Sequence, residues 1–577
     1  MRRRLPAFLG LVWLVGGLLA AGTGPAGAQA LSTQPFSGYA TGSELSTNAL
    51  TIGNTQVANV QEAFSAATAN TAGLATGIIN EMGQAVQPGL AGKNTYGRGS
   101  GVELGLINPA PQGVDVNQLK LAQMAEAAAP PPTDLIDHEI GPLPIDPILF
   151  ATLAVGKAQA LYDPNFCPIG VPLSFGQGEL ADAKLLTSTQ GGVRTGLINT
   201  DTVPDGQDVA QSRSFSYLKA NGDGTFGLVT EVHEILAPVT IGQAPVTGTP
   251  LLTIKVLGEI VMRTTATGKP GGAKVEYTGD PLIVITGPTG NQILSLTLQQ
   301  LVGQGGLNLD VPPISPILSL HVGEPPRAIG SDNAPAPKQE DPAGTAASAA
   351  VDVLRLKVIN IPGLTGLDLR LGHMETRSVV PAGGIRCQIP VNKTAVPDPV
   401  PAGSDVTIRV SIPPEGSPLK NFIGCDLVDL SATSKERVVN GNVRYTIVSA
   451  DHGGVIRGDT VSWSGLSYHP GDPPLVLTYV MHIAPGSAGL LEDTASVTAH
   501  LGNCTGGAAG QDLVGGASLN NAAVSGTFTL RGPTVGAGAG ELATTGGSAV
   551  VTLVGGGALL MAAAGVWALR RRSSLVE

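Results

Sequence analysis

Apolar and polar residues alternate with a period of two over several stretches in the C-terminal half of the chain. The clearest are residues 406–412, 475–483 and 494–499. Such alternation is typical of antiparallel strands with one buried and one exposed face. Proline- and glycine-rich turns separate these strands, so residues 385–530 are predicted to form an immunoglobulin-like β-sandwich with Trp463 in its core.

A β-rich N-terminal region is predicted over residues 31–384, where the pattern is less regular. β-branched residues and leucine are concentrated in several segments bounded by turn residues, as expected of strands. The last two of these segments are predicted to pair as a hairpin. The predicted strands are 226–236, 252–264, 282–298, 353–359 and 367–371.

Two segments of this region interrupt the strand pattern. Residues 117–129 are rich in alanine and place apolar residues at helical spacing, which predicts a short helix that ends before the prolines at 130–132. Residues 332–350 combine proline, alanine and charged residues, and are predicted to form a surface loop. The fold class predicted for the chain is therefore mainly β.

Residues 1–30 have the composition of a secretory signal peptide. Three arginines at 2–4 precede an apolar stretch at 8–21, and Ala28 and Ala30 supply small residues at the two positions that signal peptidase reads. We expect cleavage after Ala30, with cleavage after Ala28 as the alternative.

The C-terminal end predicts a membrane segment. Residues 548–569 carry no charge, and as a helix they would reach roughly 33 Å, enough to cross a bilayer core. Three arginines follow at 570–572, and the positive-inside rule places such a cluster in the cytoplasm. A transmembrane helix over 548–569 is therefore predicted, with the preceding chain outside the membrane.

A pentad of small residues stands just before this apolar span, after a glycine-rich linker at 531–541. Pentad, span and arginine tail, residues 542–577, together resemble the LPXTG-like cell-wall sorting signal that sortases read. The resemblance implies that a sortase cysteine attacks the Thr545 carbonyl, and that an amine of the peptidoglycan precursor then resolves the thioester. The pentad consists of Leu542, Ala543, Thr544, Thr545 and Gly546.

Alanine in place of the usual proline of the pentad resembles the variant that sortases of actinobacteria accept. The implied partners are a sortase, the peptidoglycan precursor and, before sorting, the membrane. The implied location is the cell wall at the cell surface, and the alternative is a retained protein with a single membrane span.

Charge argues against nucleic acid as a partner. Removal of both processed ends changes the formal net charge from −11 to −16, since six arginines and one glutamate leave with them. Such a surface repels phosphate groups. Apolar residues make up 42% of the chain, which is ample for a folded core, and the 79 glycines mark an unusual composition.

Four cysteines in an exported chain allow two disulfides in three connectivities. The candidates are Cys167, Cys387, Cys425 and Cys504. We favour Cys425 with Cys504, because both lie in the predicted sandwich. No CxxC pair and no cluster of cysteine with histidine is present, so no metal site or other cofactor is expected.

Several short motifs of the N-terminal region are similar to a known family. Residues 36–42 and 96–101, together with Gly372-His-Met-Glu375 and the following segment 381–385, resemble the choice-of-anchor G family of actinobacterial surface proteins. The resemblance would cover most of residues 31 to about 530. It implies surface display and assigns no catalytic residue.

Candidate catalytic groups are few. Five acidic or imidazole side chains fall within thirteen residues, where a metal site or an acid–base pair is conceivable, but a solvated loop is the favoured interpretation. They are Asp134, Asp137, His138, Glu139 and Asp146.

Other chemical signals have simpler interpretations. His233 with Glu234 lacks the second histidine of HExxH and is predicted to be a pair on a strand surface. Ser100 is outside a GxSxG frame, and its neighbouring glycines are expected in a tight turn. Residues 221–225 are predicted to form a glycine-rich turn rather than a calcium loop. Lys393 could form an isopeptide bond with an asparagine of a late strand, but no motif supports one.

These observations predict a secreted, wall-anchored surface protein with a structural or adhesive display role and no catalysis. The competing class is a tethered hydrolase of wall or environmental polymers, which would require two carboxylates in one cleft. The sequence shows no such pair at a fixed spacing.

Overall fold

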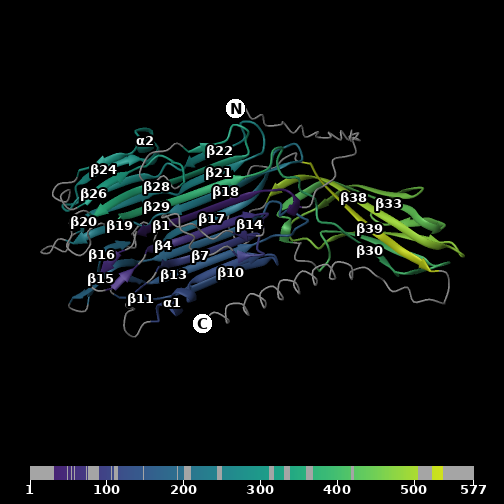
Figure 1. Cartoon of the computed structure of the whole chain (residues 1–577), viewed down its shortest axis with the longest axis horizontal. Helices are drawn as coiled ribbons and strands as arrows, with labels where there is room; N and C mark the ends of the chain where they lie inside the picture. Colours follow the sequence, from purple (N-terminus) through teal and green to yellow (C-terminus); the bar gives the residue numbers. More distant parts are fainter. Residues whose placement is uncertain are drawn as a thin grey trace, which may run out of the picture.

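The computed structural model confirms that the protein is mainly β. Figure 1 shows a large N-terminal body and a smaller sandwich placed end to end along the longest axis. The structure describes residues 31–536 except 48–49, 53–54, 58, 73, 76–89, 106, 109–114, 147, 191–192, 201–208, 244–249, 311–317, 330–337, 359–367, 417–420 and 505–522. The predicted signal peptide, the predicted sorting signal and the predicted membrane helix at 548–569 lie outside these residues. Within them, no helix is both long and apolar enough to cross a bilayer.

The N-terminal body is built around a nine-stranded antiparallel sheet, here called sheet 1. The first strand of the chain, β1, lies in the middle of this sheet, between β29 and β4. In sheet order the strands are β25 (Leu307–Leu309), β26 (Leu318–Val322), β28 (Ala346–Val358), β29 (Asp368–Val379), β1 (Ser37–Thr47), β4 (Val60–Asn70), β7 (Thr95–Leu104) and β9 (Met124–Ala129), with β27 (Gln339–Glu340) paired to β28. The predicted hairpin of 353–359 with 367–371 is confirmed as β28 and β29.

Sheet 2 has seven strands and sheet 3 has eight, and the chain alternates between them in hairpins. In order, sheet 2 contains β10 (Thr133–Ile140), β13 (Leu153–Ala160), β14 (Pro172–Ala181), β17 (Val209–Ala220), β18 (Phe226–Ile235), β21 (Ile260–Ala266) and β22 (Lys274–Thr278). Sheet 3 contains β11 (Leu143–Ile145), β12 (Leu149–Ala151), β15 (Ala183–Gln190), β16 (Val193–Thr200), β19 (Val239–Gln243), β20 (Pro250–Leu257), β23 (Leu282–Thr286) and β24 (Gln292–Thr297).

The chain bends where it passes from one of these two sheets to the other. Asp182 and Gly258 have φ values of +46° and +122° at two of these points, between β14 and β15 and between β20 and β21. The predicted strand 252–264 is therefore two strands in different sheets. The predicted strand 282–298 is likewise wrong as a single element, because a turn at residues 287–291 folds it into the hairpin β23–β24.

Sheets 1 and 2 approach each other so closely that backbone meets backbone. A Cβ atom on Gly99 of β7 would lie 1.9 Å from the Gln177 carbonyl oxygen of β14, and one on Gly176 would lie 2.0 Å from that of Arg98. Serines fill the adjoining positions, where Ser65 Oγ lies 2.6 Å from Ser212 Oγ. The expectation of a tight turn around Ser100 is wrong, since these glycines stand inside a buried strand.

Sheets 1 and 3 instead enclose an aliphatic core. Leu45 and Val102 of sheet 1 share this core with Leu149, Leu185 and Leu252 of sheet 3. The body therefore has one end packed through small residues and another packed through large apolar side chains.

Helices are short and peripheral in the described residues. α1 spans Val116–Ala122, and α2 (Leu298–Gly303) begins at a capping box formed by Thr297 and Gln300. The helix predicted over 117–129 ends early, because Met124–Ala129 forms β9 with alternate residues buried. The remaining short elements are the 3-10 helix η1 (Leu31–Thr33), β2 (Leu50–Ile52), β3 (Thr55–Val57), β5 (Leu74–Ala75), β6 (Leu90–Ala91) and β8 (Ile107–Asn108).

The predicted loop 332–350 is wrong at its C-terminal end. Residues from Ala346 onward belong to β28, and Ala347, Ala349 and Ala350 are at most 1% exposed. The alanines of this segment suggest a loop by composition, but the crowded sheet requires small residues at these positions.

The C-terminal sandwich consists of a four-stranded and a six-stranded sheet, here called sheets 4 and 5. Residues 406–412 and 475–483 are confirmed as strands, and Trp463 is 2% exposed in the core. Sheet 4 contains β30 (Asn392–Val396), β32 (Asp405–Ile412), β37 (Leu475–Ile483) and β34 (Tyr445–Ala450). Sheet 5 contains β31 (Val400–Pro401), β39 (Ala523–Gly536), β38 (Ala488–Cys504), β33 (Cys425–Asn442), β36 (Thr460–Tyr468) and β35 (Val455–Arg457). Its last strand thus continues past the predicted boundary at residue 530.

Body and sandwich are joined covalently as well as by packing. A disulfide links Cys167 of the body to Cys387, with the two Cα atoms 5.4 Å apart. Ile169 and Ile423 form a β-bridge across the junction. The favoured pairing of Cys425 with Cys504 stays a prediction, since the Cys504 side chain lies outside the described residues. The strand register places the two cysteines opposite each other in β33 and β38.

The glycine contacts predict a large stability loss for Gly99→Ala. Its new methyl group would overlap a backbone oxygen, so two sheets must separate, and we expect a cost of at least about 2 kcal/mol. Gly303→Ala is the matched control, because no atom lies within 4 Å of the position where its Cβ would be. Equal unfolding midpoints in denaturant for both variants would contradict this account of the packing.

Candidate functional site

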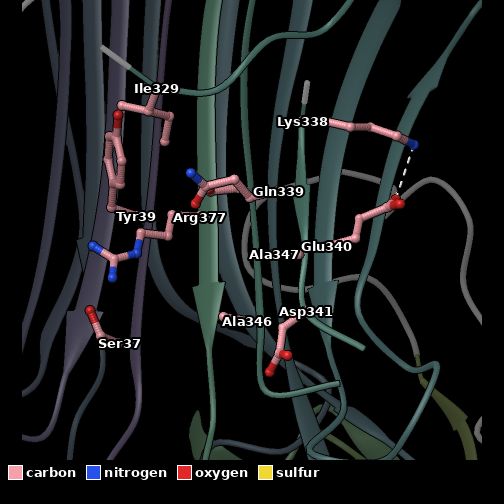
Figure 2. A pocket seen from close by; sticks show the side chains of 11 residues that line it. Ser37, Tyr39, Ile329, Lys338, Gln339, Glu340, Asp341, Ala346, Ala347 and Arg377 are labelled. Atoms are coloured by element: carbon pink, nitrogen blue, oxygen red, sulfur yellow. Dashed lines mark hydrogen bonds and ion pairs between the residues drawn. The ribbon is translucent and has the colours of Figure 1, made fainter. Parts of the chain in front are cut away.

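A polar groove lies on the face of sheet 1 that points away from sheet 2. It encloses about 770 Å³. Figure 2 shows Tyr39 and Arg377 on one side and the chain from Lys338 to Asp341 on the other. The groove exists because β27 pairs with β28 only over two residues and leaves the neighbouring strands β29 and β1 uncovered.

Most charges at the groove are already paired. Lys338 Nζ lies 3.0 Å from Glu340 Oε1, and Asp341 accepts hydrogen bonds from the Thr345 backbone and side chain. Arg377 differs, because it is exposed and the described residues offer its guanidinium no hydrogen-bond or ion-pair partner. The groove can therefore offer a guanidinium fork to a carboxylate or another acidic group.

A row of buried charges continues along the same face of β29 behind Arg377. The Tyr39 hydroxyl donates to Glu375, whose Oε1 lies 3.5 Å from His373 Nε2. His373 Nδ1 lies 2.6 Å from Asp352 Oδ1, and Arg327 lies 3.0 Å from Asp352 Oδ2. The row is thus a connected set of buried polar groups that begins at Tyr39, which lines the groove.

Asp352 is the anionic centre of this row. It is 0% exposed. Burial alone would raise the pKa of its carboxyl, but His373 and Arg327 outweigh that effect and hold the pKa well below its usual range. Asp352 is therefore an anion that fixes neighbouring cations, which makes the row a rigid support rather than an acid–base pair.

Three further carboxyls, which the sequence analysis missed, are buried in the N-terminal body. Glu44, Glu62 and Glu234 are at most 1% exposed. Burial raises the pKa of Glu62 to about 8, and burial followed by the charge of Glu62 raises that of Glu44. Glu234 accepts a hydrogen bond of 2.6 Å from Ser212. These carboxyls are neutral acids closed off from solvent, so a polymer substrate does not reach them.

The sequence contains a signal for this buried cluster in two polar pairs, Ser43-Glu44 and Gln61-Glu62. Both are polar pairs in the interior of strands in which most other residues are small. A strand packed on both faces buries even its polar positions, and a sequence reading that assumes one solvated face misses them.

The acidic group around residue 137, predicted to lie in a solvated loop, is mostly on a strand. Asp134, Asp137, His138 and Glu139 lie along β10, an edge strand of sheet 2, rather than in the predicted loop. Asp137 pairs with Lys157 at 3.4 Å, and His138 bonds to the Met124 carbonyl. Asp146 lies apart and accepts a hydrogen bond from Thr187. Within the described chain, no group of three or more His, Cys, Asp or Glu side chains is arranged to hold a metal ion.

His233 and Glu234 do lie on a strand, β18, but the prediction of a surface pair is wrong. Both are buried, and His233 lies between Glu231 and Glu259 at 3.2 and 3.1 Å. Ser100 Oγ lies 2.8 Å from the Val102 carbonyl oxygen and 2.9 Å from Gln123 Oε1, two acceptors that occupy its hydroxyl and leave it without the base that a nucleophile needs there.

The predicted turn at 221–225 is confirmed, since Asn221 N bonds to Thr225 O between β17 and β18. The residues predicted to be read by signal peptidase and sortase lie outside the described residues; they are Ala28, Ala30, Leu542, Ala543, Thr544, Thr545 and Gly546.

Comparisons with known proteins add little to these observations. No protein family and no curated protein matches the chain. The N-terminal domain of the Streptococcus gordonii adhesin Sgo0707 aligns with 69% of this chain and 90% of its own, at 8% identity and a TM-score of 0.15. The collagen binding domain of the Erysipelothrix rhusiopathiae surface protein RspB aligns over 55% and 90%, at 10% identity and a TM-score of 0.13. Scores this low carry no argument, so function is inferred from the chain's own residues.

The buried glutamates predict that stability falls as pH rises. A carboxyl whose pKa moves from 4.5 unfolded to about 8 folded stabilises the fold below pH 4.5 and loses this contribution as pH rises toward 8. For Glu62 the loss is about 3 kcal/mol between pH 4.5 and pH 7. We expect Glu62→Gln to flatten this dependence and to raise the unfolding free energy at pH 7.

Denaturant unfolding at several pH values measures the effect. Glu139→Gln is the control, since Glu139 is exposed on β10. An unchanged pH slope in Glu62→Gln would show that Glu62 is ionised in the folded protein.

Proposed function

We propose that the chain is a secreted surface protein of an actinobacterial cell wall, in which the N-terminal body makes contacts and the sandwich is a stalk. One observation carries the proposal: the chain enters the sandwich beside the body and leaves it at the opposite end. A protein that only needed two adjacent domains would have no need to place its C-terminal exit so far from the body.

The strand registers support this path. β33 begins at Cys425, two residues after the junction bridge at Ile423, and its far end pairs Asn442 with Ala488. β39 pairs Ala523 with His500 near the junction and Val535 with Gly489 at the far end. Fourteen residues of β39 correspond to about 45 Å of strand, so the exit is separated from the body by the length of the sandwich.

Attachment at that far end is assigned to the sorting signal. A sortase would cleave after Thr545 and join it to the peptidoglycan precursor, with the apolar span 548–569 holding the chain in the membrane until then. Only a few residues, 537–545, would then separate the end of β39 from the wall, so the stalk would stand directly on its attachment point.

Contact with neighbours or surfaces is assigned to the body and most specifically to the groove. Its exposed Arg377 is supported from behind by the buried row of charges, which holds β29 and β1 in fixed relation. The ligand chemistry that fits is an acidic group on a protein or glycan.

A wall-tethered hydrolase is the alternative function. It requires two carboxylates facing a cleft, and the carboxyls that the structure brings together, Glu44, Glu62 and Glu234, have no access to solvent. Hydrolysis of a wall polymer by the purified protein would favour this alternative.

Anchoring predicts distinct fates for two neighbouring threonine variants. Thr545→Ala changes the residue whose carbonyl the sortase attacks, so we expect the protein to remain in the membrane fraction. Thr544→Ala, at the position where sorting signals tolerate variation, should still be released with wall fragments by muramidase. Intact residues 570–577 on muramidase-released wild-type protein would contradict sorting.

Arg377→Glu should weaken adhesion while leaving display unchanged, because it replaces the guanidinium of the groove with a repelling charge. We expect adhesion of displaying cells to neighbouring cells or test surfaces to fall at least severalfold. Arg437→Glu is the matched control, since Arg437 is exposed on the stalk. Equal adhesion by both variants at equal surface density would remove the groove from the contact site.

A further inference from the structure

A lysine is buried between the two sheets of the sandwich, together with two carboxyls. Lys393 lies on β30 of sheet 4, with its side chain 0% exposed. Glu436 and Asp493 are direct cross-strand partners on β33 and β38 of sheet 5. Both are at most 2% exposed and face the lysine across the core. Two carboxyls and one amine in such a place are an unusual and costly combination.

The contacts place the Lys393 amine against the Asp493 carboxyl. Lys393 Nζ contacts Asp493 Oδ1 directly and lies 2.5 Å from Ser434 Oγ. The Tyr479 hydroxyl lies 2.9 Å from Asp493 Oδ2 and also contacts Glu436 Oε1. Glu436 Oε2 is buried and has no hydrogen-bond partner among the described atoms. An oxygen of Glu436 is thus free to carry a proton beside the reacting pair.

Burial favours the protonation states of Lys393 and Glu436 that formation of an amide requires. It lowers the pKa of Lys393 to about 7, so a neutral amine is readily available as a nucleophile. It also raises the pKa of Glu436, which favours a carboxyl that can accept and return a proton. The same surroundings exclude water, which would otherwise favour hydrolysis.

We propose that Lys393 and Asp493 join in an intramolecular isopeptide bond that forms spontaneously after the sandwich folds. The sequence suggested an asparagine as the partner of Lys393, whereas the structure places an aspartic acid there. Lys393 Nζ attacks Cγ of Asp493, to which the protonated Glu436 gives its proton, and the C–N bond forms. Glu436 then takes a proton from nitrogen and returns it to the departing oxygen, so that the C–O bond breaks, one water leaves and Glu436 ends as a carboxylate. Nothing is oxidised or reduced, and no co-reactant is needed.

Tyr479 and Ser434 are positioning residues for this step. Tyr479 can donate to Asp493 Oδ2, where negative charge develops when the carbonyl is attacked. Ser434 lies within hydrogen-bond distance of both Lys393 Nζ and Asp493 Oδ1, at 2.5 and 3.1 Å. Groups held at such contact distances can gain an effective concentration of about 10⁵ M or more over free reactants.

The bond would bridge sheets 4 and 5, from the first strand of the sandwich to a strand beside its last one. Lys393 is the second residue of the first sandwich strand, and Asp493 is on the strand next to the exit strand β39. A pull between the body and the wall would then pass from Lys393 to Asp493 without stretching the intervening residues. The inference depends only on residues of the sandwich, so it stands or falls independently of wall anchoring.

Mass spectrometry of the full-length protein tests the bond. The protein is extracted in detergent, denatured, reduced and digested with trypsin, which does not cut after an acylated lysine. We expect residues 387–409 and 458–531 to be recovered as one species whose mass is lower than the sum of the two peptides by one water. Recovery of a peptide that ends at Lys393, together with unlinked 458–531, in most molecules would overturn the proposal.

Three variants assign the roles. Lys393→Met and Asp493→Ala should abolish the linked species. Glu436→Gln should leave a folded sandwich by circular dichroism but at least a tenfold lower linked fraction when wild type is complete. Lys435→Met, at an exposed neighbour on β33, should link as wild type does. Full linkage in a folded Glu436→Gln protein would remove Glu436 from the reaction.

Discussion

Backbone contact between two sheets is the constraint on which the N-terminal body depends. Sheets usually pack through interdigitating side chains about 10 Å apart, but at Gly99 and Gly176 no side-chain atom fits between β7 and β14. Glycine, serine and alanine are therefore required on the facing strands, which accounts for the glycines inside β1, β7, β13 and β14. The crowding also closes the interface to solvent, so the carboxyls that enter it remain neutral. Charges that could meet a ligand are left on the opposite face of sheet 1, where Arg377 and its buried support lie.

In the proposed function, the sandwich joins the body to an attachment point at its other end. Its core is ordinary in composition, with Trp463 and Tyr479 in ring contact at 6.1 Å. What distinguishes it is a pair of covalent or potentially covalent ties. The Cys167–Cys387 disulfide fixes the junction, and Lys393, six residues further along the chain, contacts Asp493 across the sandwich core. Both ties involve the short stretch of chain that leads from the body into the sandwich.

Sequence reasoning succeeded where one face of a strand is apolar and failed where both faces are crowded. Residues 475–483 were predicted correctly because every second side chain enters the sandwich core. The alanines at 117–129 and 332–350 were assigned to a helix and a loop, since small residues have weak preferences and their demand for close packing comes from a sheet distant in sequence. The same limitation hid Glu62, whose burial depends on strands that the local pattern does not reveal. Lys393 was noticed, but its partner was not, because cross-strand register is a tertiary property.

The claim that the sandwich is a covalently clamped stalk is tested most directly by pulling on single molecules. The full-length protein is held at the body and at the C-terminal end in reducing buffer, and the length released when the sandwich unfolds is measured. Unfolding residues 392–536 without a clamp would release about 500 Å of chain. A bond from Lys393 to Asp493 withholds the roughly 100 residues between them, so the account predicts about 150 Å. Release of the full length from most molecules would contradict it.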